Sequence, residues 1–401
     1  MEKDNRGPMK VAAILNRLAA GSLLIGLGQG AQFALLPLIV AMTGLSPALL
    51  GGIVGGGTLV GLLGALLWGR MADRQGYRRV AVWAVAVYAA AQALMLLALF
   101  GAQQDWLTAA GVAAWIAVVR LAHGFSVAGI QPVLQGWCGV LTDAAGRFAG
   151  LAKLSAALSL GRLVGPLLAT AAILSPLLPF GLVALLALPI LAVIIRLPDP
   201  VVTPALPAER RRLRPDRALA VGFLMTLALG QIYATLGLYL QARDGLTAEA
   251  AAGGMGLSLS LAALAALGLQ TLVLPRLALT PRLTRPGQIA AIALGLGCLV
   301  PLWLRGIVGA ALGASLISLG ATLLAAITAT RVSLGAGPGQ HGRVAGGQSA
   351  AQNLGYAAGA AAGGVLFQIA PAAPLIAAAA CAVALLLLES LPAAAKPLLP
   401  P

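Results

Sequence analysis

Charged residues are scarce in this chain of 401 residues, at 9% of the sequence. Soluble domains carry about 25% charged residues, so this low fraction excludes an ordinary soluble protein. Aromatic residues are also few, at 4%, whereas hydrophobic residues make up 60% and the mean hydropathy is +0.95. The composition therefore predicts a protein that crosses a membrane several times.

Cysteine and histidine are nearly absent. The three cysteines, Cys138, Cys298 and Cys381, fall in or beside apolar runs, and an odd number argues against a disulfide framework. The two histidines, His123 and His341, are far apart in the sequence. We therefore expect no metal site and no other cofactor.

Acidic residues are the rarer charge, at 11 against 26 lysines and arginines, which gives a net charge of +15. The basic residues gather in short loops on one side of the apolar runs. If both termini are in the cytoplasm, the only basic residues assigned to the non-cytoplasmic side are Arg243 and Arg305, in agreement with the positive-inside rule. This asymmetry accounts for the charge without a nucleic-acid partner, and it predicts a multi-pass plasma-membrane protein, in the inner membrane of a bacterium.

The apolar runs are rich in Ala, Leu and Gly and have near the roughly 20 residues that cross a bilayer as a helix. Strand patterns are absent, so the sequence predicts an all-α membrane protein. Hydropathy, broken at charges, prolines and glycines, gives about twelve transmembrane helices. We place them at 14–42, 48–68, 79–100, 107–138, 148–172, 176–196, 218–241, 250–274, 287–304, 306–330, 344–370 and 372–390.

The chain repeats itself at half its length. The pattern Gly-Arg-x-Ala-Gly occurs at 146–150 and again at 342–346, and Gly28-Gln29 recurs as Gly230-Gln231. Repeats about 200 residues apart predict two pseudo-symmetric six-helix bundles in the same order. We expect these bundles at 1–196 and 218–401. Residues 197–217, with five prolines and a run of three arginines, are the predicted cytoplasmic linker.

A short loop between the second and third spans has the sequence Gly-Arg-Met-Ala-Asp-Arg-Gln-Gly-Tyr-Arg-Arg at 69–79. It resembles the loop motif of the major facilitator superfamily (MFS) of secondary transporters, whose two parallel halves match the repeat. The resemblance implies that this loop helps to hold the cytoplasmic side shut when the cavity faces out. Its implied gating residues are Gly69, Asp73, Arg74, Gly76 and Arg78. A signal that only fixes topology is the alternative.

Two further elements resemble motifs of the same family. Arg120 to Gly124 is similar to the Arg-x-x-Gln-Gly element of the fourth span, with His123 in place of Gln. Gly161, Gly165 and Pro166 in the fifth span are similar to the Gly-x-x-x-Gly-Pro element typical of the family's antiporters, and they imply a packing and hinge surface. That pattern continues with a glycine where this chain has an alanine, so the resemblance favours export without requiring it.

Once the charged residues assigned to either side of the membrane are set aside, three basic residues remain in the predicted spans and no acidic residue does, because Glu389 marks the inner end of the last span. Lys153 is near a span end, so its ammonium group can reach the headgroups. Arg120 lies roughly 20 Å deep at 1.5 Å per residue, where a charge needs water or a partner. Arg162 also lies deep. The cavity is therefore predicted to be electropositive, which favours anionic, carboxylate-bearing substrates over lipophilic cations.

Polar side chains on the predicted cavity helices complete the candidate substrate site. We assign to it Arg120, His123, Gln131, Arg162, Gln29, Gln32, Gln231, Gln348, Gln352 and Tyr356. The glutamines could bind substrate or hold helices together, since both uses occur in membranes. His123 is the predicted proton-coupling residue because imidazole titrates near neutral pH, and a satisfied helix histidine is the alternative.

These observations predict a secondary active transporter. We expect it to export a small organic anion, carboxylate-bearing and siderophore-like, by proton-coupled alternating access of the antiport type. Its partners would be the substrate, protons and the bilayer, and it would act as a monomer. The alternative is a broad-specificity multidrug/proton antiporter that gives drug resistance. An enzyme is not expected, because Gly124 to Gly129 resembles a nucleophile turn but lies in a helix without an acid-base triad.

Overall fold

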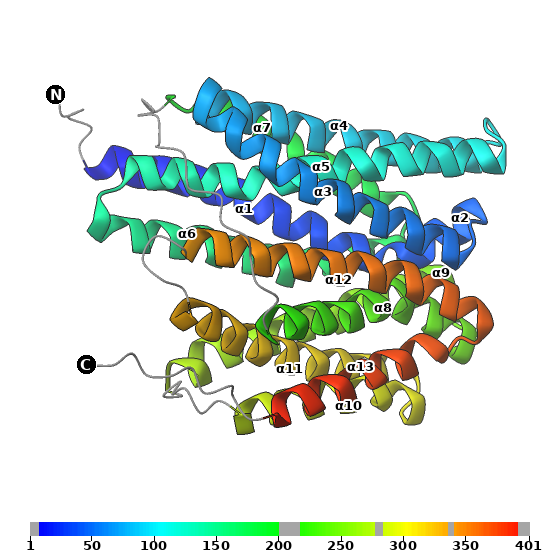
Figure 1. Ribbon diagram of the computed structural model, residues 1–401. Coiled ribbons are helices and arrows are strands. Elements are labelled where there is room, and N and C mark those ends of the chain that lie inside the picture. Colours follow the sequence, from blue (N-terminus) through cyan, green and yellow to red (C-terminus); the bar gives the residue numbers. More distant parts are fainter. Residues whose placement is uncertain (1–7, 200–216, 277–283, 336–340, 392–401) are drawn as a thin grey trace.

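The computed structural model describes residues 8–199, 217–276, 284–335 and 341–391. Within these ranges every regular element is a helix, and the long helices run side by side along one axis (Figure 1). The expected all-α membrane fold is confirmed. Eleven described helical segments are long and apolar enough to span a membrane. The glycine-rich helix α12 is not among these eleven.

The element order follows the predicted spans closely. The N-terminal half contains α1 (Pro8–Ala34), α2 (Leu36–Thr43), α3 (Pro47–Gln75), α4 (Tyr77–Gln103), α5 (Ala109–Leu141), α6 (Ala144–Val164), η1 (Gly165–Ile173) and α7 (Leu178–Ile195). The C-terminal half contains α8 (Arg217–Asp244), α9 (Ala248–Gly268), η2 (Leu269–Val273), η3 (Leu274–Arg276), α10 (Thr284–Trp303), α11 (Gly306–Gly335), α12 (His341–Ile369) and α13 (Ala373–Ser390). Residues 200–216 of the predicted linker lie outside the described residues, and the division into two bundles and a linker stays a prediction.

Prolines break two of the predicted spans. The first span, expected at 14–42, divides at Leu35 into α1 and α2. Pro37 is the cause, because it has no N–H to donate to Phe33 and its ring clashes with that carbonyl. In the same way the fifth span continues as a tighter 3-10 helix from Gly165, next to Pro166. Both breaks lie near the middle of the protein, close to the residues that form the candidate site.

Helix α1 begins and α13 ends at the same end of the bundle (Figure 1). We call this end the terminal side and the other end the opposite side. One buried apolar cluster belongs to the N-terminal half alone and lies toward the terminal side, around Tyr88 and Trp137. The other cluster joins both halves, since it contains Leu38 and Leu50 together with Met255. The halves therefore share a core toward the opposite side.

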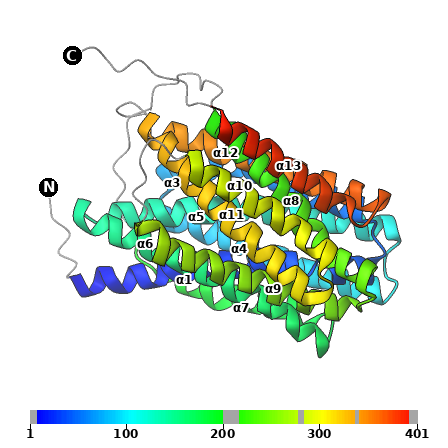
Figure 2. The same ribbon diagram turned by 90° about the horizontal axis from the view of Figure 1, so that it is seen from below.

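The contacts that join the halves lie in the middle and toward the opposite side. On the α3–α12 pair, a Cβ added at Gly51 would lie 2.4 Å from the carbonyl oxygen of Ala360. In Figure 2, α9 lies next to α6 of the other half. There Ser260 Oγ donates to the Leu163 carbonyl at 2.7 Å, which is a hydrogen bond between the halves. The protein is thus closed at the opposite side.

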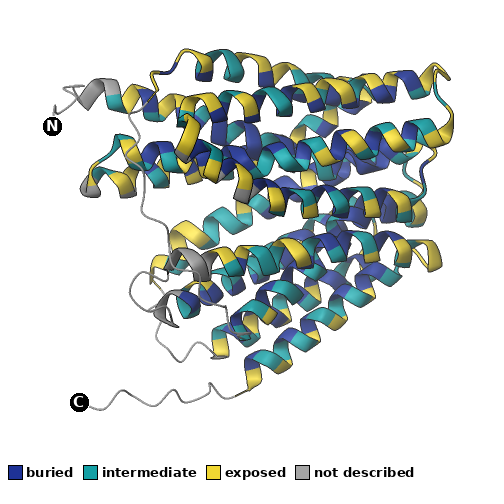
Figure 3. Cartoon of the chain, turned by 45° about the horizontal axis from the view of Figure 1, so that its top comes forward, coloured by how far each residue is buried: buried dark blue, intermediate teal, exposed yellow. Residues whose placement is uncertain are grey.

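The outer faces of the helices carry the apolar side chains that a bilayer would cover. Figure 3 shows the buried residues along the interior and the exposed residues on the outer faces and helix ends. Trp303 is 87% exposed and Leu174 is 82% exposed. Large apolar side chains with this exposure are stable in contact with lipid, in agreement with a membrane protein.

Candidate functional site

Arg120 is the centre of the candidate site. It lies in α5 and is 6% exposed. Its Nη1 is 3.1 Å from Nδ1 of His123, one helical turn later. Because a guanidinium only donates, Nδ1 must accept, and His123 is then neutral with its proton on Nε2. The Nε of Arg120 is buried and has no partner. The site therefore holds a cation with a free donor.

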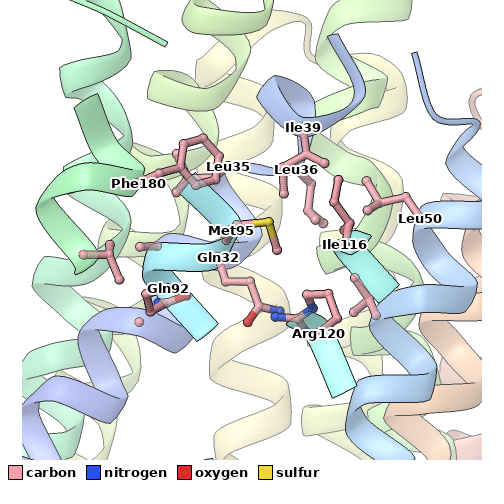
Figure 4. A pocket seen from close by; sticks show the side chains of 14 residues that line it. Gln32, Leu35, Leu36, Ile39, Leu50, Gln92, Met95, Ile116, Arg120 and Phe180 are labelled. Carbon is pink, nitrogen blue, oxygen red and sulfur yellow. The ribbon is translucent and has the colours of Figure 1, made fainter. Parts of the chain in front are cut away.

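Arg120 closes one end of a cavity within the N-terminal half. The empty volume is about 530 Å³ with its opening included, and α1, α2, α3, α4, α5 and α7 line it. Figure 4 shows Gln32 reaching toward Arg120 at one end, while Leu36 and Ile39 lie farther along the cavity. The cavity is thus amphipathic, with its polar groups gathered around the guanidinium.

Tyr88 and Gln92 of α4 support this polar end, and the sequence analysis missed both. The ring of Tyr88 lies 5.3 Å from the ring of His123, and Gln92 Nε2 donates to its hydroxyl at 3.2 Å. A Cβ at Gly28 would lie 1.8 Å from that hydroxyl, so α1 and α4 meet there only because position 28 is glycine. The four-residue spacing of Tyr88 and Gln92 on one helix face was the available signal.

Arg162 is the second deep cation. Its Nε and Nη2 donate to Oε1 of Gln29 in α1, at 3.2 and 3.0 Å. The side chain is exposed to solvent although α6 lies at the interface between the halves. It is close enough to Tyr233 of α8 for an electrostatic interaction. Arg162 therefore faces the space between the halves with its orientation fixed by Gln29.

Three aromatic rings meet at the interface between the halves. Phe33 lies 5.5 Å from Tyr233 and 5.7 Å from Tyr356, and the two tyrosine rings are 6.4 Å apart. Phe33 belongs to the N-terminal half and both tyrosines to the C-terminal half. The Tyr356 hydroxyl is buried without a partner, and it interacts electrostatically with Arg120. We call Phe33, Tyr233 and Tyr356 the aromatic trio. The trio links the halves at the level of both guanidinium groups.

The remaining predicted glutamines lie apart from the two arginines. Gln231 Nε2 donates to the Leu227 carbonyl at 3.3 Å and reaches Cys381 Sγ in α13 at 3.8 Å. Gln348 and Gln352 pack on α8, where a Cβ at Gly222 would lie 2.3 Å from Gln348 Nε2 and 3.3 Å from Gln352 Cγ. Both amide atoms of Gln131 are buried without a partner. These four residues contact helices and do not contact either arginine.

The loop motif joins α3 to α4 at the terminal side. Gly76 has φ = 91°, a conformation that glycine adopts at no steric cost. The backbone N–H of Arg78 donates to Asp199 at 3.2 Å, so that carboxylate lies at the N-terminus of α4. Arg74 is exposed. Positions 69 and 73 lie in α3, and their side chains are outside the described part. The sequence analysis missed Asp199, which ties the loop to the end of α7.

The fifth-span motif packs α6 and η1 against α1. A Cβ at Gly161 would lie 2.3 Å from the Leu23 carbonyl oxygen, and one at Gly165 would lie 2.2 Å from that of Leu27. The Pro166 ring lies beside Gly30. The backbones therefore approach at a distance that only glycine permits, as in other membrane helix pairs. A gating role for Gly161, Gly165 and Pro166 stays a prediction.

A groove of about 1200 Å³, open to the outside, runs between α5 and α6 toward the terminal side. Gln135, Arg147 and Ser155 line it. On α6, Ser155 shares a face with Arg162, two turns farther into the protein. The groove therefore opens at the terminal side, and its residue Ser155 shares a helix face with Arg162.

A buried carboxylate in the C-terminal half was not anticipated. Glu389, expected only to mark the end of the last span, is 0% exposed and accepts two hydrogen bonds from Arg331, at 2.6 and 2.7 Å. Arg217 Nη2 lies 3.6 Å from the same carboxylate. The cluster joins the terminal-side ends of α8, α11 and α13. Its arginines are paired with a carboxylate, whereas no described carboxylate pairs with Arg120 or Arg162.

The sequence matches the Major Facilitator Superfamily over residues 18–360. A mutant of the nucleoside transporter NupG has a similar structure, with a TM-score of 0.71 and 14% identity over 94% of this chain and 98% of that chain. The human organic anion transporter MFSD10 has a TM-score of 0.64 and 20% identity over 96% and 100%. A bacterial homologue of the iron transporter ferroportin, in an inward-facing state, has a TM-score of 0.69 and 15% identity over 96% and 100%. No curated protein matches the sequence. The chain belongs to the Major Facilitator Superfamily and is a multi-pass membrane transporter, not an enzyme.

Proposed function

We propose that this protein exports a small organic anion, carboxylate-bearing and siderophore-like, across the inner membrane of a bacterium. The observation that carries the proposal is the pair of deep guanidinium groups, Arg120 and Arg162. The ion pairs of the described residues belong to Glu389, and no described carboxylate pairs with either of these two arginines. An ionised side chain at this depth costs several kcal/mol unless a charge or water compensates it. An anionic substrate supplies that charge.

The direction of transport is part of the proposal. We place both termini in the cytoplasm, following the distribution of basic residues. The groove on the terminal side then opens to the cytoplasm, and the shared core closes the periplasmic side. An exporter would load its substrate in this state. We further propose that one chain is sufficient, because the candidate site is made by the two halves of a single chain.

His123 is the proposed proton-coupling residue. In the structure it accepts a hydrogen bond from Arg120, and a proton on Nδ1 would remove that bond and place like charges together. An anion on Arg120 would offset this repulsion, so the contact favours binding of the proton and the anion together. Antiport, which the sequence favours, requires instead that the proton and the anion compete for binding. The pH dependence of anion affinity decides between these mechanisms.

The similar structures do not select the substrate, because they include transporters of nucleosides and of organic anions and a homologue of an iron transporter. One observation supports the alternative of a multidrug/proton antiporter: the aromatic trio could stack on a lipophilic cation. The two unneutralised arginines oppose it, since a cation would add a third positive charge to the same space.

The test is transport by purified protein in proteoliposomes. Uptake of labelled aromatic acids, matched amines and neutral analogues would be measured with and without an imposed pH gradient. We expect accumulation of the acids against their own gradient. Accumulation of amines alone would support the multidrug alternative and contradict the proposal. Equilibration without accumulation of any compound would indicate a channel.

A further inference from the structure

Five side chains from both halves lie at one depth in the protein. Phe33 precedes the last residue of α2 by ten positions, and Arg162 precedes the last residue of η1 by eleven. Tyr233 and Tyr356 precede the last residues of α8 and α12 by eleven and thirteen, and Arg120 follows the first residue of α5 by eleven. All these helix ends are on the opposite side. The two arginines and the aromatic trio therefore form one layer.

The polar groups of this layer have unused hydrogen-bond donors. Arg120 Nε and the Tyr356 hydroxyl are buried without partners, although buried polar groups are normally paired. Arg162 gives two N–H groups to Gln29, and no described residue accepts from its Nη1. Donors without acceptors around a cation fit an oxyanion, which only accepts.

The two cations are held by different partners. Arg162 donates to Gln29 and Arg120 donates to His123, while the centroids of the Tyr233 and Tyr356 rings are 6.4 Å apart. An acid bound to one arginine leaves the other without an acid unless a second acidic group reaches it. A flat apolar group that joins two acids can lie against the rings, because aromatic faces stack on planar partners.

Charge balance during transport also favours a substrate with two acidic groups. In the present state solvent reaches Arg162, but Arg120 is 6% exposed. Alternating access requires a state closed at both ends, in which Arg162 also loses its water. A single negative charge would then leave one cation unmatched, whereas two negative charges match both.

We propose that the substrate is an organic dianion, with two acidic groups joined by a flat apolar spacer. Arg120 and Tyr356 hold one acid across the interface between the halves, Arg162 holds the other, and the spacer lies against the aromatic trio. This inference rests on the proposed function and names its substrate class.

The test compares matched mono- and diacids by calorimetric titration of the purified protein at neutral pH. The pairs are benzoate with terephthalate, and biphenyl carboxylate with biphenyl dicarboxylate. The variants are Arg162→Gln, which can still bond Gln29, Arg120→Gln, and Lys153→Gln as a control. Lys153 is an exposed cation on the same helix as Arg162, bonded to Asn16, so its substitution changes the net charge equally.

We expect wild type and Lys153→Gln to bind the better-fitting diacid at least tenfold tighter than its monoacid, the worth of one charge-assisted hydrogen bond. Arg162→Gln should remove this preference and keep monoacid affinity, and Arg120→Gln should weaken both acids. Equal affinity of wild type for mono- and diacids, or an unchanged preference in Arg162→Gln, would overturn the dianion while leaving the anion exporter in place. Failure to bind any of the four acids would overturn both.

Discussion

Single side chains decide the charge of the candidate site, and the sequence identified the most important of them. Arg120 and Arg162 were predicted because a cation far from any span end is rare and costly in a membrane. Their partners were not predictable. Gln29 and Gln231 look alike in a hydropathy profile, yet Gln231 donates to a carbonyl of its own helix, whereas Gln29 accepts from Arg162 of another helix. Only the rotation of each helix about its own axis decides which neighbour such a side chain faces, and hydropathy does not give that rotation.

Gly28 gives a sharp test of how the polar end of the cavity is built. Gly28→Ala would place a methyl group 1.8 Å from the Tyr88 hydroxyl, so α1 and α4 must separate and the melting temperature should fall. Tyr88→Phe removes the hydroxyl, and the double variant should recover most of the loss. Thermal unfolding of both single variants and the double variant measures this coupling. Additive losses would mean that the two positions are not in contact.

His123 gives a test of proton coupling. As pH falls from 8 to 6, a carboxylic acid stays ionised, since its ordinary pKa is near 4. Any change in its affinity then comes from the protein. If the contact with Arg120 sets the sign, acid affinity should rise once the pH is low enough for His123 to gain a proton, because positive charge is then added beside the anion.

The His123→Gln variant should bind the acid with little dependence on pH, because Gln does not titrate. Calorimetric titration at three pH values measures both proteins. A fall in wild-type affinity at acid pH would favour antiport. An identical pH profile in His123→Gln would remove His123 from the coupling mechanism.

Helices were predicted well, and their breaks were predicted poorly. The fourth span was expected at 107–138 and is α5 at Ala109–Leu141, while the seventh was expected at 218–241 and is α8 at Arg217–Asp244. Hydropathy locates such spans because lipid requires long apolar helices. The division of the first span at Leu35 was not predicted, because the apolar run continues through Pro37. The helix ends there because of the backbone geometry that proline imposes.

The Glu389 cluster holds three helix ends of the C-terminal half together. Glu389→Gln removes the buried charge that Arg331 and Arg217 share, and breaking a buried ion pair costs about 3 kcal/mol. We expect a melting temperature several degrees lower. Asp105→Asn is the control, since it removes one acid from an exposed residue whose positive φ of 54° suits asparagine. Equal melting temperatures in the two variants would show that the cluster adds no stability.

The protein as a whole repeats its sequence but not every feature of its structure. The repeat predicted that Gly28 and Gly230 are equivalent, and both pack where another element approaches closely, at Tyr88 and at the Tyr356 carbonyl. The deep cations, however, lie only in the N-terminal half. The closed opposite side could not be predicted either, because one sequence must support both states of a transporter.

The central claim is that Arg120 provides the charge that binds an anion between the two halves. The most direct measurement is uptake of labelled terephthalate into proteoliposomes that contain wild type, Arg120→Gln or Lys153→Gln at equal protein density. We expect wild type and Lys153→Gln to take up terephthalate. Uptake by Arg120→Gln should be at least tenfold lower, because a buried charge-assisted contact is lost. Undiminished uptake by Arg120→Gln would contradict it.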